Sequence, residues 1–125
     1  MITDWINDRV IHGKKIGRVL GFPTINLENP KLLEGEREGV YLSEIQINGK
    51  KYHGVLFFGP RLILKEKEKV LEIFLIDFDE NVYGKEVSFR LLEYIRGVRN
   101  FKSKKSFQKQ LSADFQKARE IISSL

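Results

Sequence analysis

Hydrophobic and polar residues alternate along much of the chain up to residue 96, which is the pattern of half-buried β-strands. The alternation predicts strands over residues 6–12, 39–47, 51–58, 70–77 and 86–95. Asn-Gly-Lys at 48–50 joins the second and third of these, and Asn-Gly readily adopts the positive φ angles of a type I′ hairpin turn. The charged run at 65–69 is most simply a solvated hairpin tip or loop.

The hydrophobic period changes beyond residue 101. Apolar residues then recur at spacings of three and four, at Phe107, Leu111, Phe115, Ala118, Ile122 and Leu125. This spacing predicts an amphipathic helix, whose N-terminus Ser103 or Ser106 would cap. Several strands and one terminal helix indicate a mainly β domain. We expect a small closed antiparallel β-barrel, because closure leaves no strand edge exposed, with the helix packed against it.

Composition limits the classes of protein to which the chain can belong. Its 125 residues, 42% apolar and 31% charged, suit one globular domain over 1–125. The absence of cysteine excludes disulfides, zinc-thiolate sites and a cysteine nucleophile. The net charge of +5 favours an anionic partner. No signal region or apolar run of about 18 residues is present, so we expect a cytoplasmic protein that does not bind a membrane.

A glycine-rich stretch with basic residues follows the first predicted strand. It contains Gly13, Lys14, Lys15, Gly17, Arg18 and Gly21. Glycines let main-chain N–H groups approach an anion closely, and the adjacent cations add attraction, which is how loops bind phosphates. The spacing matches neither a Walker A loop nor a dinucleotide-binding motif. A plain turn-rich loop is the simpler alternative on the glycine spacing alone.

Pro-Thr-Ile-Asn at 23–26 is a more specific signal. Pro23 fixes its own φ angle and pushes Phe22 towards an extended conformation. In an extended segment, Thr24 and Asn26 project from the same face. A hydroxyl and an amide oxygen side by side are hard, neutral ligands that suit Mg²⁺ shared with substrate phosphates. The alternative is a local turn in which these side chains satisfy backbone groups.

Glu72 lies inside the nearly continuous apolar strand predicted at 70–77. A buried carboxylate is costly unless it is paired or functional. Beside a substrate hydroxyl it would act as a general base, with its pKa raised by desolvation. The alternative is an acid on the barrel exterior paired with a lysine. The period of two leaves this open, because Val70 and Phe74 share the face of Glu72 while Leu71 and Ile73 occupy the other.

Five segments, together with Gln110, Asp114 and Ala118 of the predicted helix, resemble the riboflavin kinase family, which also forms the C-terminal half of bacterial bifunctional FAD-synthesis enzymes. The segments are VIHGKKIGRVLGFPTINL at 10–27, GVY at 39–41, GVLFFG at 54–59, EIFLIDFDENVYGKEV at 72–87 and YIRGVRNFKS at 94–103. The resemblance implies a small Greek-key β-barrel with a C-terminal helix, in agreement with the hydrophobic pattern.

The resemblance also implies an activity and its site. The family transfers the γ-phosphoryl group of ATP to the 5′-hydroxyl of riboflavin with Mg²⁺, forming FMN and ADP. By position, Thr24 and Asn26 would hold the metal, and Glu72 would take the proton from the hydroxyl. Residues on the ATP side would be Gly13, Lys14, Gly17, Arg18, Pro23, Asp79 and Tyr83. Arg96 and Phe101 would belong to a mobile flap that closes on the flavin. We expect a monomer with small-molecule substrates and no nucleic-acid partner.

Several positions depart from the family pattern around the expected flavin site. Bacterial members commonly have Asn where this chain has Phe57, and Pro-Thr-Phe where it has 62–64 (Leu-Ile-Leu). Thr-His is replaced by Ile-Phe at 73–74, and the flap has Val98 for an acid and Asn100 for a lysine. The metal pair and the base are retained. Two alternatives to a kinase therefore stay open: an impaired flavin- or nucleotide-binding module of the same fold, and a basic barrel that binds nucleic acid. The second would need aromatic residues on a cationic groove, whereas most aromatics here alternate into apolar strands.

Overall fold

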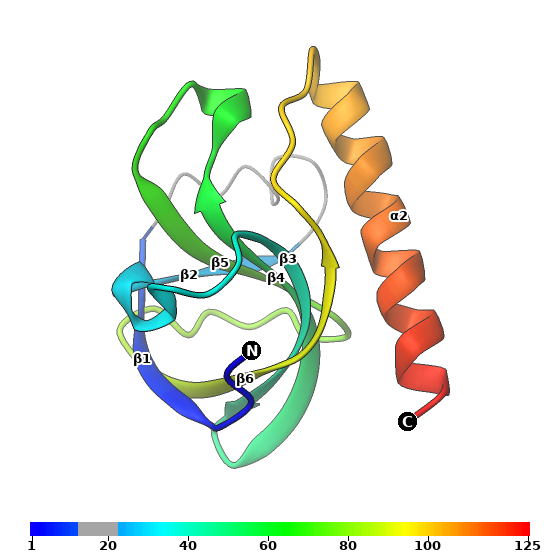
Figure 1. The fold of residues 1–125 in the computed structure, drawn as a ribbon. Coiled ribbons are helices and arrows are strands. Elements are labelled where there is room, and N and C mark those ends of the chain that lie inside the picture. Colours follow the sequence, from blue (N-terminus) through cyan, green and yellow to red (C-terminus); the bar gives the residue numbers. More distant parts are fainter. Residues whose placement is uncertain (13–22) are drawn as a thin grey trace.

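The sheet of this protein closes on itself (Figure 1). The structure is a computed structural model, and it describes residues 1–12 and 23–125. The strands are β1 (Ile6–Ile11), β2 (Thr24–Leu27), β3 (Gly39–Ile47), β4 (Lys50–Pro60), β5 (Lys69–Leu75) and β6 (Glu86–Arg96). They are accompanied by the short 3₁₀ helices η1 (Pro30–Leu33) and η2 (Leu62–Leu64) and by the long helix α2 (Lys104–Ser123).

The strand order confirms the expected Greek-key barrel. Around the barrel the strands run β1-β2-β5-β4-β3-β6, and every neighbouring pair is antiparallel. Strands β3, β4 and β5 follow one another directly, and β6 returns to lie beside β3, which is the Greek-key arrangement. Pairing of β1 with both β2 and β6 closes the sheet.

The predicted elements are found with shifted ends. The Asn48-Gly49 turn has φ values of 51° and 80°, as the hairpin prediction requires. Strand β5 ends at Leu75, two residues before its predicted end. Asp77 has a left-handed φ of 57°, which ends the extended backbone there. Ser103 caps α2 by accepting a hydrogen bond from the Ser106 backbone N–H.

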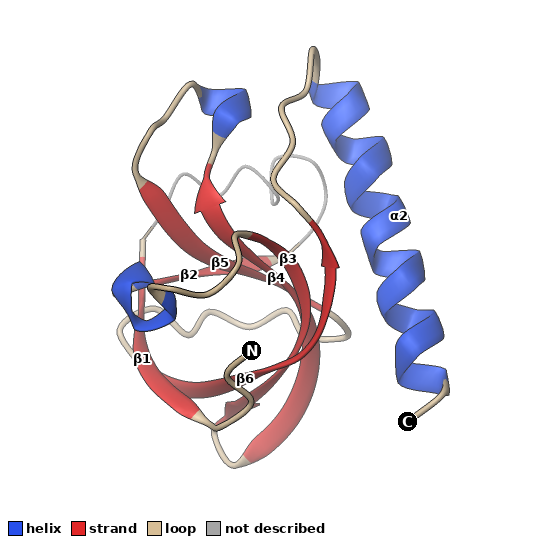
Figure 2. Cartoon of the chain, in the orientation of Figure 1, coloured by secondary structure: helices blue, strands red, loops and turns tan. Residues whose placement is uncertain are grey.

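Two apolar clusters lie on opposite faces of the barrel wall. On β5, Leu71, Ile73 and Leu75 face the barrel interior, whereas Phe74 faces outward and packs with α2 through residues such as Leu111. Figure 2 shows α2 running alongside the barrel, where it covers part of the outer surface. Within the described chain, no helix is both long enough and apolar enough to cross a membrane. The outward face under α2 is where the candidate site lies.

Candidate functional site

Glu72 is buried although it lies on the outward face of β5. Its side chain is only 1% exposed. Carboxylate oxygen Oε2 accepts a hydrogen bond of 2.7 Å from the Thr24 hydroxyl, and Oε1 lies 2.7 Å from Nη2 of Arg61. The outward orientation agrees with the alternative of an exterior acid, but the partner of Glu72 is a buried arginine and not a lysine. Glu72 is therefore a desolvated carboxylate with a partner at each oxygen, and its role as general base stays a prediction.

Thr24 and Asn26 project from one face of β2, as the Pro-Thr-Ile-Asn motif predicts. Strand β2 pairs with β5 so that Asn26 is opposite Glu72 and Thr24 is opposite Phe74. Both polar side chains are 7% exposed. Thr24 donates to Glu72, and the Asn26 Oδ1 atom accepts a 2.7 Å hydrogen bond from Arg61 Nη2. Both bonds join residues far apart in the sequence, so the alternative of a local turn does not apply.

Arg61 is the functional candidate that the sequence analysis did not identify. It follows β4 directly and is 6% exposed, and its Nη2 atom contacts both Asn26 and Glu72. Its Nε–H is buried and has no hydrogen-bond partner among residues 1–12 and 23–125. The available signal was a single cation within the otherwise apolar run at 55–64. Such a residue is costly to bury unless an acid pairs with it.

The surroundings of Glu72 alter its acidity. Burial raises the pKa of Glu72 above its ordinary value of 4.5. The charge of Arg61 and the hydrogen bonds from Thr24 and Arg61 favour the carboxylate and oppose this effect, but desolvation is the larger cause. A base with a raised pKa is better matched to accepting a proton near neutral pH.

The chemistry of the donor atoms fits Mg²⁺. Thr24 and Asn26 offer a hydroxyl and a carbonyl oxygen, with the Glu72 carboxylate hydrogen-bonded to the first. Hard oxygen donors of this kind suit Mg²⁺, which is usually held by few protein ligands together with substrate phosphates. In the part of the chain that the structure describes, no cluster of three or more His, Cys, Asp or Glu residues is placed to hold a metal. A bound ion would therefore depend on substrate oxygens as well.

A pocket with mainly apolar walls adjoins Glu72 and Arg61, and we call it the apolar hollow. Strands β3, β4 and β5, η2, the segment 96–101 and α2 surround it. Its lining includes Val40, Val55, Phe57, Leu62, Ile63, Phe74, Phe101, Phe107 and Leu111, with Glu72 and Arg61 at its polar end. Four of the positions that depart from the family pattern, Phe57, Leu62, Ile63 and Phe74, thus lie in its wall. These substitutions make the wall more apolar without touching the contacts of Glu72.

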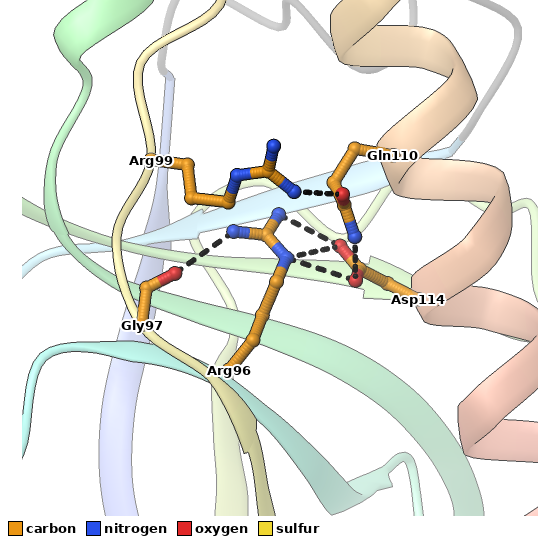
Figure 3. Close-up of polar contacts among 5 residues, drawn as sticks. All are labelled: Arg96, Gly97, Arg99, Gln110 and Asp114. Atoms are coloured by element: carbon orange, nitrogen blue, oxygen red, sulfur yellow. Dashed lines mark hydrogen bonds and ion pairs between the residues drawn. The ribbon is translucent and has the colours of Figure 1, made fainter.

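An ion pair anchors the end of β6 to α2 at the edge of this hollow (Figure 3). Arg96 donates from Nε and Nη2 to the Asp114 carboxylate at 2.8–3.1 Å, and Asp114 is 2% exposed. Gln110 donates to Asp114 at 3.0 Å and accepts a hydrogen bond from Arg99. Arg96 also lies over the Phe101 ring. The expected flap residues Arg96 and Phe101 therefore meet at the hollow, and their movement stays a prediction.

A second pocket borders Thr24 and Asn26, and we call it the polar hollow. Its lining includes Thr24, Asn26, His12 and Tyr83. The His12 and Tyr83 rings stack with centroids 3.6 Å apart and planes at 16°. Tyr83 is 53% exposed, which leaves much of this ring available to a ligand.

Two other residues predicted on the ATP side, Pro23 and Asp79, do not line this pocket. Asp79 lines a separate depression together with Pro23, between the barrel and α2. Pro23 also accepts a backbone hydrogen bond from Leu75, which ties the start of β2 to β5. Gly13, Lys14, Gly17 and Arg18 lie outside the described residues. Their assignment to ATP stays a prediction.

Comparison with known proteins identifies the family. The family model described as "Flavokinase: Riboflavin kinase" matches residues 5–122. The chain belongs to the riboflavin kinase family. It is 39% identical over 106 residues to the RNA-binding riboflavin kinase RibR of Bacillus subtilis, covering 84% of this chain and 45% of that protein. It is 34% identical over 124 residues to the bifunctional riboflavin kinase/FMN adenylyltransferase of the same bacterium, covering 97% of this chain and 39% of that enzyme. This riboflavin kinase family member thus spans less than half the length of both relatives.

Solved structures agree with the family assignment at the level of the fold. A crystal structure described as a macrolide-efflux protein from Streptococcus pneumoniae matches with a TM-score of 0.79 and 30% identity, covering 94% of this chain and 38% of that one. Riboflavin kinase from Trypanosoma brucei matches with a TM-score of 0.68 and 18% identity, covering 98% of this chain and 79% of that one. The barrel with its C-terminal helix is therefore the fold of this family.

Proposed function

We propose that the chain is a riboflavin kinase that transfers the γ-phosphoryl group of Mg²⁺-bound ATP to the 5′-hydroxyl of riboflavin. One observation carries the proposal: the Thr24–Glu72–Asn26 cluster lies between two pockets of different chemistry. Glu72 lines the apolar hollow, whereas Thr24 and Asn26 line the polar hollow. A transfer between two substrates needs reacting groups at such a boundary, because both substrates must meet there.

Each pocket suits one of the two substrates. The apolar hollow has aromatic walls, including Phe57, Phe74 and Phe101, that suit the flat ring of a flavin. Its polar end at Glu72 is where the hydroxyl of the sugar-like chain would lie. The polar hollow would take the phosphates of ATP beside Thr24 and Asn26, with Tyr83 available for stacking.

The protein's part in the reaction is positioning and proton transfer. Phosphoryl transfer depends mainly on in-line alignment and on neutralising charge. Mg²⁺ held by Thr24 and Asn26 would supply charge neutralisation on the phosphates. Glu72 accepts the proton of the substrate hydroxyl at its carboxylate as the oxygen–phosphorus bond forms and the bond to the ADP oxygen breaks. Thr24 and Arg61 hold the carboxylate in place for this step.

The same geometry argues against an impaired binding module. A protein that only binds flavin or nucleotide has no need of a buried carboxylate held by two donors. Of the positions that depart from the family pattern, Phe57, Leu62, Ile63 and Phe74 lie in the wall of the apolar hollow, and none of the departing residues supplies a side-chain hydrogen bond or ion pair to Thr24, Asn26 or Glu72. We therefore expect these changes to affect flavin affinity more than the transfer step.

The test is replacement of the base by its isosteric amide. Glu72→Gln keeps the size of the side chain and one of its two acceptor oxygens, but it removes the proton-accepting carboxylate. We expect FMN formation to fall by about 10²-fold or more, while the affinity for Mg²⁺-ADP, measured by isothermal titration calorimetry, changes little. A Glu72→Gln variant that forms FMN at the wild-type rate would exclude Glu72 as the base.

A further inference from the structure

Arg61 places one positive charge between Glu72, the proposed base, and Asn26, a proposed metal ligand. Its Nη2 atom lies 2.7 Å from Glu72 Oε1 and 2.7 Å from Asn26 Oδ1. Arg61 and Glu72 are both buried, so their charges are poorly screened by water. The guanidinium group therefore occupies, in this structure, the oxygen through which Asn26 would bind a cation.

A cation at Asn26 and the guanidinium group of Arg61 would compete for the same atom. Two positive charges that share one carbonyl oxygen repel each other strongly in a buried site. Glu72 Oε1 is a separate acceptor and would retain Arg61 without this conflict. Arg61 also has a second buried donor, Nε–H, with no acceptor among the described residues, so part of the guanidinium group is not committed to the present arrangement.

We propose that the Arg61 guanidinium group and a divalent cation exchange at Asn26 Oδ1. Arg61 donates to Asn26 when no divalent cation is bound and releases this oxygen when one binds. In both states Arg61 keeps its contact with Glu72 and so orients the carboxylate. This inference rests on the proposed function. It makes Arg61 a positioning residue, because it acts through Asn26 and Glu72. After the exchange, its free N–H groups can be donated to an anionic oxygen of the substrate, for which a guanidinium group is well suited.

The proposal predicts opposite effects of Arg61 on cation binding and on turnover. Arg61→Met removes the charge while retaining much of the apolar side-chain volume. We expect it to bind Mn²⁺ about tenfold more tightly than wild type, because the competing cation is gone and Glu72 is left uncompensated. We expect kcat for FMN formation to fall at least about tenfold, because the carboxylate is no longer held.

Mn²⁺ binding is measured directly, by titrating the ion into the purified chain with ADP present to supply phosphate oxygens and following free Mn²⁺ by electron paramagnetic resonance, with ADP alone as the reference. Arg90→Met is the matched control, because Arg90 pairs with Glu44 and lines neither hollow. It makes the same change in net charge, and we expect wild-type Mn²⁺ affinity and kcat. Weaker or unchanged Mn²⁺ binding in folded Arg61→Met would overturn the proposal, since general damage to the site weakens both properties together.

A second measurement uses the wild-type chain and does not depend on the folding of the variant. The probe is the buried Nε–H of Arg61 in a ¹⁵N–¹H spectrum of the arginine side chains, assigned by its loss in Arg61→Lys. With ADP present, this signal should shift on addition of Mg²⁺ but not of K⁺ at equal ionic strength. An Arg61 signal that stays fixed through Mg²⁺ saturation would contradict the exchange. Absence of FMN formation by the wild-type chain would count against the proposed function, whereas both measurements on Arg61 give their result without turnover.

Discussion

At the scale of single residues, the site depends on a carboxylate that faces out of the barrel and is still buried. Glu72 is 1% exposed because Arg61, Thr24 and the elements around the apolar hollow cover it. Burial disfavours its charged form, while its two partners favour that form. The balance gives a base that is protonated more readily than an exposed glutamate.

This balance predicts the acid side of the pH profile. Burial raises the pKa of Glu72 above 4.5. Because the reaction needs the carboxylate, kcat should fall as the pH is lowered through this raised value, and the midpoint of the fall should lie above pH 4.5. The profile is obtained from initial rates of FMN formation, with circular dichroism confirming that the chain stays folded. A midpoint at or below the pKa of an exposed glutamate would contradict the assignment.

The residue types at the site were predictable from the sequence where they follow local rules. Thr24 and Asn26 lie two apart in an extended segment after a proline, so their shared face follows from the period of a strand. The same period puts Glu72 and Phe74 on one face of β5. It does not show that other parts of the chain cover this face and bury Glu72. Arg61 could not be found in this way, because its partner Asn26 is 35 positions away and meets it only after the barrel has closed.

At the scale of elements, the end of β6 and helix α2 form one side of the apolar hollow. The bidentate contact of Arg96 with Asp114 fixes the segment after β6 against the helix, and Gln110 extends the network to Arg99 (Figure 3). The helix was predictable from its apolar period and its Ser103 cap, whereas its attachment through Asp114 was not. Asp114 reads in the sequence as an ordinary polar residue of an amphipathic helix.

This attachment predicts a loss of stability in Asp114→Asn. The change leaves the partly buried Arg96 cation without its counter-charge, which should lower the free energy of unfolding by about 1–3 kcal/mol. The free energy is measured by urea denaturation. Glu120→Gln, at an exposed position of the same helix, is the matched control and should change it by less than about 0.5 kcal/mol. Equal effects of the two substitutions would show that the ion pair contributes nothing.

At the scale of the whole molecule, the closed barrel and α2 bring Glu72, Thr24, Asn26 and both hollows together. A closed barrel was predictable because exposed strand edges are unfavourable, and closing the sheet on itself removes them. The strand order was not set by the hydrophobic pattern, since β2 pairs with β5 across 41 intervening residues and only the tertiary fold shows it. This pairing is what places Asn26 opposite Glu72.

The central claim is that these 125 residues carry out the kinase reaction, although they span less than half the length of the two bacterial relatives compared above. The most direct measurement incubates the purified chain with riboflavin, ATP and Mg²⁺ and separates the flavins by chromatography, with an EDTA control. The account predicts an FMN peak that grows with time and is lost on chelation. Riboflavin that binds, as shown by quenching of its fluorescence, but yields no FMN would contradict the account and favour a binding module.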